Sequence, residues 1–539
     1  MSSAALSSAR SDAAVGGSRF RDHVNHPDYE VLAYIDGDFR PAGGDWIPVL
    51  DKAAGVPFGR YTNCSAEQVD RAVAAARRAQ PGWAGLTTRA RAAFLTRGRH
   101  WLLAHRQEVV DCIVAENGKA AEDAIVEIVY CASAFAYWGK HARRLLATAK
   151  IRSLSPFVLG RAMVTRRVPL GVVGVIGPWN NPLLNSFGDA IPALAAGNAV
   201  VLKPSEHTPL AALLMARMAR ECAWPEDVFQ VVTGAGGTGR SLVDTADFVM
   251  FTGSTRTGRV VAARAGERLI PCSLELGGKD ALVVLADAPL ERAVNVTIQG
   301  ALSNGGQMCT SVERVYVEEP VYDAFVTLLR ERFQRVTAGR PAGLGSTDVG
   351  AVTFPPQMAV IAEHVKDAVD RGARVLVGGH ASPGPGRFFE PTLLVDVDHT
   401  MRCMWEETFG PTLPVMKVAD ADEAVRLVND SSYGLQASII GSNVKRARRL
   451  AERLEVGCVT VNDAQTNYMA LGLPMGGWKE SGLGVRHGAE GIRKYTRLQA
   501  VSVNWFPMRR DLHMIPYQPS AYRFILRLVD ILYGARRKK

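Results

Sequence analysis

The sequence contains only eight cysteines, and they do not cluster. They stand at positions 64, 112, 131, 222, 272, 309, 403 and 458, without a Cys-X-X-Cys pair or a Cys/His cluster. This scatter argues against both a zinc site and a disulfide framework. We therefore expect reduced thiols, a cytoplasmic protein and no bound metal.

Long apolar runs and concentrated charge are absent from the body of the chain. No apolar run reaches the roughly 18 residues that a membrane-spanning helix needs, so none is expected. The net charge of +10 is not strongly localised in the body, which disfavours nucleic acid as a partner. With 539 residues and 47% hydrophobic content, the composition is that of a soluble enzyme of two or three domains.

The N-terminal part combines a leader with long helices. Residues 1–28, rich in Ser, Ala, Gly and Arg, are interpreted as a disordered leader, with an acid-poor transit peptide as the alternative. Ser65 and Gln68 form a capping-box pattern that begins the first of four helices, predicted at about 65–80, 87–105, 107–116 and 119–146. Residues 148–168 predict a β-hairpin without a core of its own, which we expect to pair with another subunit.

Short apolar runs alternate with helical stretches from Leu170 onward. Strands are expected at 172–176, 199–202, 228–232, 248–251 and 281–285, and a second series of strands and helices runs from about 286 to 465. This rhythm predicts an α/β fold with two doubly wound, parallel-sheet domains. Because ligands in such folds bind at the carboxyl ends of the strands, the residues that follow these runs are the candidate site.

The chain ends in an apolar strand, predicted at 498–504, and a tail from Pro507 to Lys539. Apolar residues recur in the tail at helical spacing, namely Tyr522, Ile525, Leu526, Val529, Leu532 and Tyr533, before a terminal Arg-Arg-Lys-Lys. Two interpretations stay open. The tail is either a helix docked on the protein or an amphipathic basic helix on an anionic membrane surface.

Cys309 and Glu275 are the first candidates for chemistry. Cys309 follows an Asn-Gly-Gly-Gln segment, and such a glycine pair suits a loop whose amides face a ligand. The thiol is either a nucleophile, once ionised, or a small buried hydrophobe like the other cysteines. Glu275 lies between two leucines and before another glycine pair. It is either paired in the core or held as a general base with a raised pKa.

Polar residues also follow three of the predicted strands. Asn180 follows the strand at 172–176 and either donates to a developing oxyanion or caps the next helix. Lys203 and Glu206 have the spacing to hold a ribose diol after the second strand. The turn at Gly253 and Ser254 opens a helix whose free amides suit a pyrophosphate. The glycine-rich segment 234–239 is not a standard dinucleotide fingerprint, since it is not a clean Gly-X-Gly-X-X-Gly at the first βα turn.

The order of these motifs resembles the aldehyde dehydrogenase superfamily. The motifs are Pro-Trp-Asn at 178–180, Lys-Pro-Ser-Glu at 203–206, Phe-Thr-Gly-Ser at 251–254, Leu-Glu-Leu-Gly-Gly-Lys at 274–279, Gly-Gln-Met-Cys at 306–309 and Glu-Glu-Thr-Phe-Gly-Pro at 406–411. The resemblance covers residues 30–505, and the spacing of 34 residues from Glu275 to Cys309 also looks like that family. The tail is similar to those of some bacterial members described as succinate-semialdehyde dehydrogenases, but no substrate follows from it.

This resemblance implies a covalent mechanism. Cys309 attacks the aldehyde, Asn180 and the N–H of Cys309 hold the oxyanion, and Glu275 activates the water that hydrolyses the thioester. The implied cofactor is NAD, with NADP less favoured because the Glu206 carboxylate would repel a 2′-phosphate. The implied cofactor-binding residues are Trp179, Lys203, Ser205, Glu206, Gly253, Ser254, Glu407 and Phe409. A CoA-acylating relative and a catalytically silent protein of the same shape are the alternatives.

The resemblance also implies domain boundaries and partners. The expected parts are a cofactor-binding domain of residues 29–147 and 169–276, a catalytic domain of 277–480, an oligomerisation arm of 148–168 and 496–505, and an amphipathic tail of 506–539. The expected partners are a small aldehyde and further copies of the chain, in a homodimer or homotetramer. The tail adds a peripheral membrane contact as an open interpretation.

Several residues depart from the common pattern of the family. Asn181 stands where an aromatic residue is usual, and Asn185, Ser186 and Gly188 replace bulkier residues of the entrance. These changes predict a wider or more polar funnel, and Met475 is expected to add a flexible side chain to its wall.

A second departure concerns charge. Many relatives carry a Lys on the helix after the oxyanion Asn and a Glu late in the chain, whereas this sequence has Asp189 and Arg486. Since both signs are exchanged together, we predict an ion pair between Asp189 and Arg486 close to Glu275.

Overall fold

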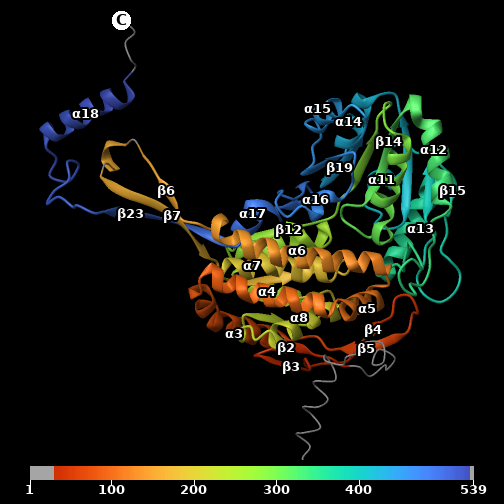
Figure 1. Cartoon of the computed structure of the whole chain (residues 1–539), viewed down its shortest axis with the longest axis horizontal. Coiled ribbons are helices and arrows are strands. Elements are labelled where there is room, and N and C mark those ends of the chain that lie inside the picture. The colour runs from red at the N-terminus through yellow and green to blue at the C-terminus, as the bar shows by residue number, and fades with distance from the viewer. Residues whose placement is uncertain (1–29, 154, 159, 535–539) are drawn as a thin grey trace, which may run out of the picture.

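The computed structural model describes residues 30–153, 155–158 and 160–534. It shows two lobes, each built on its own β-sheet, and a long arm that leaves one of them (Figure 1). The leader predicted over 1–28 and the basic end of the tail lie outside the described residues. None of the helices within the described ranges is long and apolar enough to cross a membrane.

Four long helices precede the parallel strands of the first large sheet. They are α3 (Ala66–Gly85), α4 (Thr88–Ala104), α5 (Arg106–Asn117) and α6 (Ala121–Leu145). The Ser65 hydroxyl accepts from the Gln68 N–H, and the Gln68 side chain accepts from the Ser65 N–H, so the predicted capping box is confirmed. Trp83 and Trp138 are almost fully buried and pack these helices onto the sheet.

The first lobe contains an eight-stranded sheet in the order β22-β12-β11-β8-β9-β10-β2-β3. Its five central strands are parallel: β8 (Val172–Ile176), β9 (Ala199–Lys203), β10 (Phe229–Val231), β11 (Phe248–Thr252) and β12 (Cys272–Glu275). The edges are antiparallel, with β2 (Ala33–Ile35) and β3 (Asp38–Arg40) on one side and β22 (Gly482–Leu483) on the other. Four of the five central strands were predicted, whereas β12 and the antiparallel edges were not, and the predicted strand at 281–285 belongs to the sheet of the second lobe.

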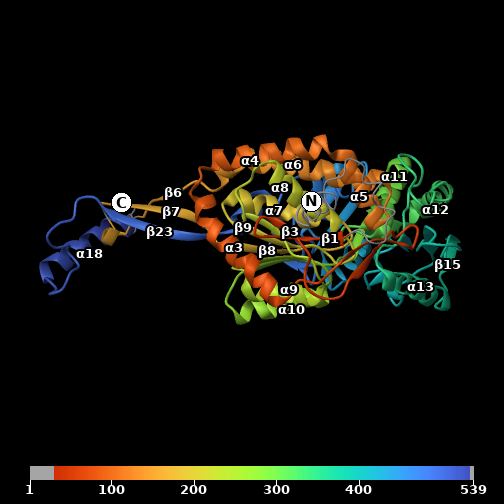
Figure 2. The same ribbon diagram turned by 90° about the horizontal axis from the view of Figure 1, so that it is seen from below.

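Helices cover both faces of this sheet, and its central parallel strands are accordingly almost entirely buried. Helices α3, α9 (Gly236–Thr245) and α10 (Thr255–Glu267) lie on one face (Figure 2). Helices α4, α6, α7 (Gly188–Ala196) and α8 (Leu210–Glu221) lie on the other. A π-helical turn, η2 (Leu183–Phe187), leads into α7.

The second lobe contains a seven-stranded sheet in the order β15-β16-β17-β14-β13-β19-β20. The strands are β13 (Asp280–Val284), β14 (Val312–Glu318), β15 (Arg374–Val377), β16 (Thr392–Val395), β17 (Thr412–Val418), β19 (Gln436–Ile440) and β20 (Cys458–Val461). Only β15 is antiparallel to its neighbour. The run that forms β16 is short and was not predicted.

Five helices flank the second sheet, and the remaining elements are short. The helices are α11 (Leu290–Leu302), α12 (Glu319–Phe333), α13 (Pro355–Asp370), α14 (Ala421–Asn429) and α15 (Val444–Ala451). The short elements are β1 (Glu30–Val31), β4 (Ile47–Leu50), β5 (Pro57–Tyr61), η3 (Ser303–Gly306), η4 (Arg402–Met404), β18 (Tyr433–Gly434), α16 (Thr466–Met469), β21 (Trp478–Lys479) and α17 (Gly488–Arg493).

The arm is a three-stranded antiparallel sheet that projects from the first lobe (Figures 1 and 2). It consists of β6 (Ala149–Ile151), β7 (Arg161–Pro169) and β23 (Thr496–Asn504), with a short 3-10 turn, η1 (Pro156–Val158), at its tip. The predicted hairpin is therefore confirmed, and the late strand completes it. Helix α18 (Pro519–Tyr533) lies against the far end of the arm.

Candidate active site

One cavity of about 270 Å³ brings the predicted catalytic residues together. It lies between the two lobes, where β8, β11 and β12 of the first sheet reach their carboxyl ends, the position expected for a ligand in such a sheet. Cys309, Glu275 and Asn180 all line it. The other lining residues are Pro178, Trp179, Asn185, Thr252, Gly253, Ser254, Leu276, Gly277, Phe354, Gln357, Val360, Glu407 and Phe409.

Cys309 is held by a tightly turned loop after α11. Asn304, Gly305 and Gly306 follow one another with φ values of 53°, 61° and 72°, in the left-handed region that favours glycine. A Cβ at Gly306 would lie 2.1 Å from the carbonyl oxygen of Gly410, so only glycine fits there. Burial raises the pKa of the Cys309 thiol to about 12, against the opposing effect of the Arg486 charge. The thiol is therefore neutral and needs a base as it attacks.

Glu275 is the last residue of β12, and the strand directs its side chain into the cavity. The residue is 3% exposed, and its Oε1 atom has no hydrogen-bond partner among the described residues. Burial raises the pKa of this carboxyl to about 7, while the charges of Arg486 and Lys494 oppose the rise. A buried carboxylate with a free oxygen and a pKa near neutrality suits a general base.

This pKa predicts how turnover depends on pH. Glu275 accepts a proton only when it is ionised, so kcat should fall as the pH decreases through about 7. Steady-state rates between pH 5 and 9 measure this decrease, which forms the acidic limb of the pH profile. Glu275→Gln should abolish the limb together with most of the activity, whereas Glu291→Gln, at an exposed position on α11, should retain both. A limb that persists in Glu275→Gln would assign it to another group.

Asn180 is fixed by several hydrogen bonds at the end of β8. Its Nδ2 donates to the carbonyl oxygen of Gln307 at 2.8 Å, which brings the amide next to the Cys309 loop. Its own carbonyl oxygen accepts from Lys119 Nζ at 2.8 Å and from Asn304 Nδ2 at 3.0 Å. The backbone at Asn180 is therefore held from two elements, and its side chain donor faces the nucleophile loop.

Lys119 was not recognised as part of this site from the sequence. It forms a fully buried ion pair with Glu127, with 2.7 Å between Nζ and Oε1. Glu127 in turn accepts from the N–H groups of Leu183 and Leu184, each at 2.9 Å. The pair thus joins α6 to the segment that carries Asn180. No motif in the sequence indicated this, because the groups that Lys119 and Glu127 bind, at Asn180 and Leu183, are about 60 residues away in the chain.

Most of the predicted entrance residues do not line the cavity. Asn181 turns away from it, since its Oδ1 accepts from Lys119 Nζ at 2.8 Å. Ser186 and Gly188 are buried in packed surroundings, and a Cβ at Gly188 would lie 2.7 Å from the ring of Tyr130. Only Asn185 lines the cavity. The wider funnel is therefore wrong for Asn181, Ser186 and Gly188, because Asn181 binds Lys119 and the other two residues pack closely against Gly177 and Tyr130.

The structure also corrects the predicted position of Met475 on the wall of the funnel. It is 1% exposed and packs in the core of the first lobe rather than among the residues that line the cavity. The Pro-Met-Gly-Gly segment passes behind the pocket wall. A methionine there fills space in the core, as its flexible side chain allows.

The predicted ion pair between Asp189 and Arg486 is confirmed. Arg486 Nε and Nη2 lie 2.9 and 2.8 Å from the two carboxylate oxygens of Asp189, in a bidentate arrangement. Arg486 also donates to the Tyr468 hydroxyl at 2.7 Å and to the Thr252 hydroxyl at 2.8 Å. The pair is buried, and its charges act on the pKa of Glu275 in opposite directions.

The predicted cofactor residues form two groups. Trp179, Gly253, Ser254, Glu407 and Phe409 line the cavity itself. Ser254 is the N-cap of α10, and its hydroxyl accepts from the Thr257 N–H, so the free amides of this helix end face the cavity. Glu407 accepts from the N–H of Gly278 at 2.9 Å, and burial raises the pKa of its carboxyl to about 8.

Lys203, Ser205 and Glu206 lie outside the cavity, at the carboxyl end of β9. Lys203 Nζ donates to two carbonyl oxygens and lies 3.5 Å from the carboxylate of Glu206. The Ser205 hydroxyl accepts from the N–H of His207 at 3.2 Å. Since β9 neighbours β8 in the sheet, these residues continue the line of strand ends that starts at the cavity. Such a line fits an extended dinucleotide better than a small ligand.

These features coincide with a known family. A sequence model described as the aldehyde dehydrogenase family matches residues 39–501. The chain belongs to the aldehyde dehydrogenase family. Its members oxidise aldehydes with NAD(P), and the two-lobed α/β fold with its arm is the fold of that family.

Several relatives of this aldehyde dehydrogenase have names that mention different aldehydes. A Mycolicibacterium smegmatis protein, 40% identical and covering 82% of this chain and 85% of its own length, carries the still provisional name succinate-semialdehyde dehydrogenase [NADP(+)]. A Methylomonas protein named 4,4'-diapolycopene aldehyde oxidase is 38% identical, covering 90% of this chain and 91% of its own.

Solved structures show the same fold. Lactaldehyde dehydrogenase from Escherichia coli superposes with a TM-score of 0.84 at 36% identity, covering 88% of this chain and 99% of its own. The NAD+ complex of a Bacillus cereus aldehyde dehydrogenase gives a TM-score of 0.86 at 32% identity, covering 91% of this chain and 99% of its own.

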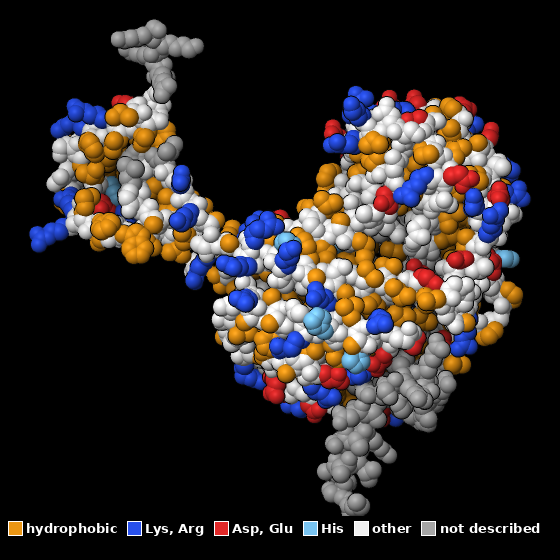
Figure 3. All heavy atoms as spheres, in the orientation of Figure 1, with side chains coloured by type: hydrophobic (Ala, Val, Ile, Leu, Met, Phe, Trp, Pro, Cys, Tyr) orange, Lys and Arg blue, Asp and Glu red, His pale blue; other side chains and the backbone are white. Residues whose placement is uncertain are grey.

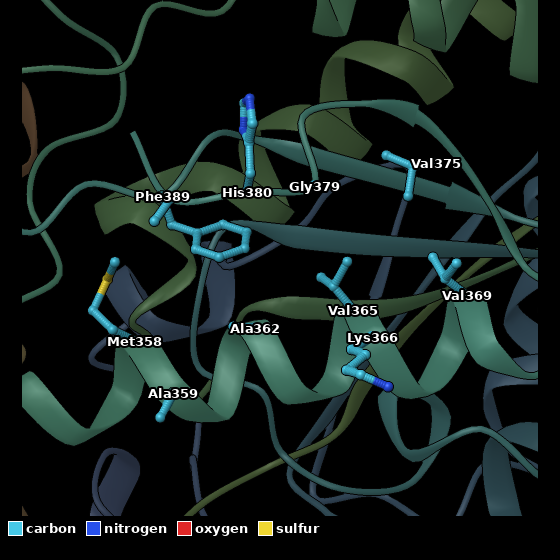
Figure 4. Close-up of a pocket in the computed structure, with 11 residues that line it drawn as sticks. Met358, Ala359, Ala362, Val365, Lys366, Val369, Val375, Gly379, His380 and Phe389 are labelled. Atoms are coloured by element: carbon cyan, nitrogen blue, oxygen red, sulfur yellow. The ribbon is translucent and has the colours of Figure 1, made fainter. Parts of the chain in front are cut away.

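A second cavity of this aldehyde dehydrogenase lies away from the predicted catalytic residues. It has a volume of about 470 Å³ and lies between α13 and the strand pair at β15 (Figure 4). Its lining is apolar apart from Lys366 and His380, as the residues Met358, Ala359, Ala362, Val365, Val369, Val375, Gly379, Ala381 and Phe389 show. Without a nucleophile or a carboxylate it offers no alternative centre for aldehyde oxidation.

Proposed function

We propose that this aldehyde dehydrogenase converts an aldehyde to the carboxylic acid with Cys309 as nucleophile, Glu275 as base and Asn180 as oxyanion donor. The observation that supports this most is their convergence on one cavity, with an unpartnered carboxylate oxygen on Glu275. A CoA-acylating relative would not need such a base, because its acceptor is a thiol. A silent protein would not need the three groups together.

The steps follow from the residues present. Glu275 takes the thiol proton as the Cys309 sulfur adds to the carbonyl carbon and forms a thiohemiacetal. The Asn180 amide and the Cys309 N–H stabilise the oxyanion, an interaction worth about 3 kcal/mol in measured cases. NAD(P), when bound, supplies the hydride acceptor. Glu275 releases the thiol proton to solvent and then takes a proton from water as the water oxygen attacks the thioester that Cys309 carries. The C–S bond breaks, the acid leaves, and the proton on Glu275 passes to the sulfur and restores the thiol.

We further propose that NAD is preferred to NADP. The residues present fit a dinucleotide, since the line of strand ends carries a helix N-terminus at Ser254 and the pair Lys203 and Glu206. A Glu206 carboxylate beside the adenosine ribose would accept from its hydroxyl groups and repel a 2′-phosphate. The names of the mycobacterial relatives contain NADP, which is the opposite of this proposal. Kinetics of this chain with each of the two coenzymes decide between NAD and NADP.

A kinetic matrix of coenzymes and aldehydes tests the proposal. We expect reduced coenzyme, followed by its absorbance, from at least one aldehyde in a panel of aliphatic, aromatic and semialdehyde substrates. The kcat/KM for NAD should exceed that for NADP by more than about tenfold, because like charges in contact cost several kcal/mol. Glu206→Gln should narrow this ratio, while Glu267→Gln, exposed at the end of α10, should leave it unchanged. A clear preference of the natural chain for NADP would refute the role of Glu206.

The panel also addresses the substrate class. Glu275 and Glu407 are the only charged residues that line the described cavity, and the one buried arginine beside it, Arg486, is already paired with Asp189. We infer that an uncharged aldehyde is accepted at least as well as succinate semialdehyde, whose carboxylate would meet no free cation there.

The remaining parts of the chain have proposed roles as well. We propose that residues 29–147 and 169–276 hold the cofactor, that 277–480 supply the nucleophile, and that the arm of 148–168 and 496–505 joins copies into a homodimer or homotetramer. Strand β23 supports the last point, since most of its side chains are exposed although its backbone is regular. All eight cysteines are free, which favours a reducing compartment such as the cytoplasm.

A further inference from the structure

The far end of the arm carries an unusual number of exposed apolar side chains. Nine large ones between 505 and 533 are 51–89% exposed, namely Trp505, Phe506, Met508, Ile515, Tyr517, Phe524, Leu526, Ile531 and Tyr533. We call this set the tail surface. In the space-filling view, orange and blue side chains alternate on this part of the molecule, well apart from the two lobes (Figure 3).

Helix α18 is docked, but only by part of its apolar side. Ala521 and Ile525, one turn apart, are 8% and 6% exposed, and the helix contacts the turn at the tip of the arm. An ion pair between Arg161 and Asp511, 2.8 Å long, fixes the preceding segment to the arm. This contact agrees with the first of the two interpretations of the tail, a helix docked on the protein. Its other apolar residues point outward.

The outward residues of α18 form two apolar flanks with a basic strip between them. At 100° per residue, Phe524 and Ile531 lie on one flank of the docked stripe, and Leu526 and Tyr533 lie on the other. Arg523 and Arg527 are exposed and lie on the remaining, polar side. Tryptophan, tyrosine and arginine beside aliphatic residues are the set that suits the boundary between lipid headgroups and acyl chains.

The charge of the tail decides between a membrane and a second copy of the chain. Residues 507–539 contain eight Lys and Arg but only two Asp and no Glu, so their net charge is +6, and the rest of the chain carries +4. Two copies that met through this surface would place like charges against each other. An anionic membrane surface complements the arginines with its phosphates and the apolar residues that flank them with its acyl chains.

We propose that the tail surface docks on the anionic face of a phospholipid membrane, with its apolar residues at the acyl boundary and Arg523 and Arg527 on lipid phosphates. The docked stripe at Ala521 and Ile525 holds the helix in place on the arm, so the surface is formed before it meets the membrane. Both lobes then stay on the water side, joined to the membrane through the arm.

Co-sedimentation of the full chain with vesicles tests this. We compare vesicles of phosphatidylcholine alone with vesicles of phosphatidylcholine and phosphatidylglycerol. At least about tenfold more protein should sediment with the anionic vesicles, and added salt should release it. Arg523→Glu with Arg527→Glu should abolish this difference, and Phe524→Ser with Ile531→Ser should reduce binding to both vesicles.

Matched variants on the body of the molecule serve as controls. Lys445→Glu with Arg449→Glu makes the same change of charge at the same spacing on α15, and Leu269→Ser with Leu344→Ser removes exposed leucines. These controls should bind like the natural chain, and all variants should keep the same aldehyde turnover. Equal binding to both vesicles, or binding that the tail variants leave intact, would overturn the proposal. So would failure to bind together with a loss of oligomers in the tail variants by light scattering, which would assign the surface to contacts between copies.

Discussion

Cys309→Ala should reduce aldehyde turnover below detection. The Cys309 thiol is the sulfur nucleophile that lines the cavity, and Glu275 and Asn180 assist the bond that it forms to the aldehyde carbon. Loss of the nucleophile costs on the order of 10⁶ in kcat in a well-measured protease, where binding and the oxyanion site remain. The measurement is coenzyme reduction at saturating aldehyde, with purified protein whose thermal unfolding matches the natural chain.

Two further variants distinguish the loss of the nucleophile from a general loss of structure. Cys222→Ala removes a half-buried thiol at the end of α8 and should retain full activity. Glu275→Gln lacks the base of both steps, so it should form the acyl-enzyme slowly and hydrolyse it slowly; after long incubation with aldehyde and coenzyme, mass spectrometry should find the added acyl group on the peptide that contains Cys309. Turnover by Cys309→Ala, or an acyl group on another cysteine, would contradict the assignment of the nucleophile.

The placement of these groups could be predicted because it depends on strand ends. The strands before Asn180, Lys203 and Gly253 each have a local signal, a run of apolar residues that is followed by a polar turn. The strand that ends at Glu275, Cys-Ser-Leu-Glu, has no such run. In a parallel sheet all such ends lie on one edge, so linear order along the chain becomes proximity in space. The antiparallel edge strands have only two or three residues each and depend on tertiary pairing, which no local pattern encodes.

Side-chain direction could not be predicted in the same way. Asn181, Ser186 and Gly188 lie within nine residues of Asn180, yet their neighbours come from elsewhere in the chain. Asn181 contacts Lys119, and Gly188 leaves room for Tyr130 on α6. A substitution in a family motif therefore has two explanations, a change in the cavity or a change in the packing behind it. For these residues the packing explanation holds.

The exchange at Asp189 and Arg486 could be predicted because two changes of opposite sign compensate each other. A lone buried charge is costly, so a sequence that reverses one partner and keeps the fold has to reverse the other. Arg486 donates four hydrogen bonds to Asp189, Tyr468 and Thr252, which fixes its position more firmly than a lysine with a single nitrogen could. We infer that this pair sets the charge around Glu275 and does not itself carry protons.

Breaking this pair should lower the stability of both single variants, and it should shift their pH profiles in opposite directions. Arg486→Met and Asp189→Asn each leave one partner buried without its counter-charge, which costs about 3–5 kcal/mol of unfolding free energy. The double variant should recover much of that loss, since no uncompensated charge remains. Denaturant unfolding of the natural chain, the two single variants and the double variant measures the coupling between them.

The pH profile separates the electrostatic role from the structural one. Arg486 lowers the pKa of Glu275 and Asp189 raises it, so Arg486→Met should move the acidic limb of kcat above about 7 and Asp189→Asn should move it below. The effect of Arg486 is the larger of the two, and the double variant should therefore lie between the natural chain and Arg486→Met. A purely structural role would lower the stability of both single variants and leave the limb in place. Opposite shifts of the limb, at similar losses of stability, can come only from two charges that both act on the base.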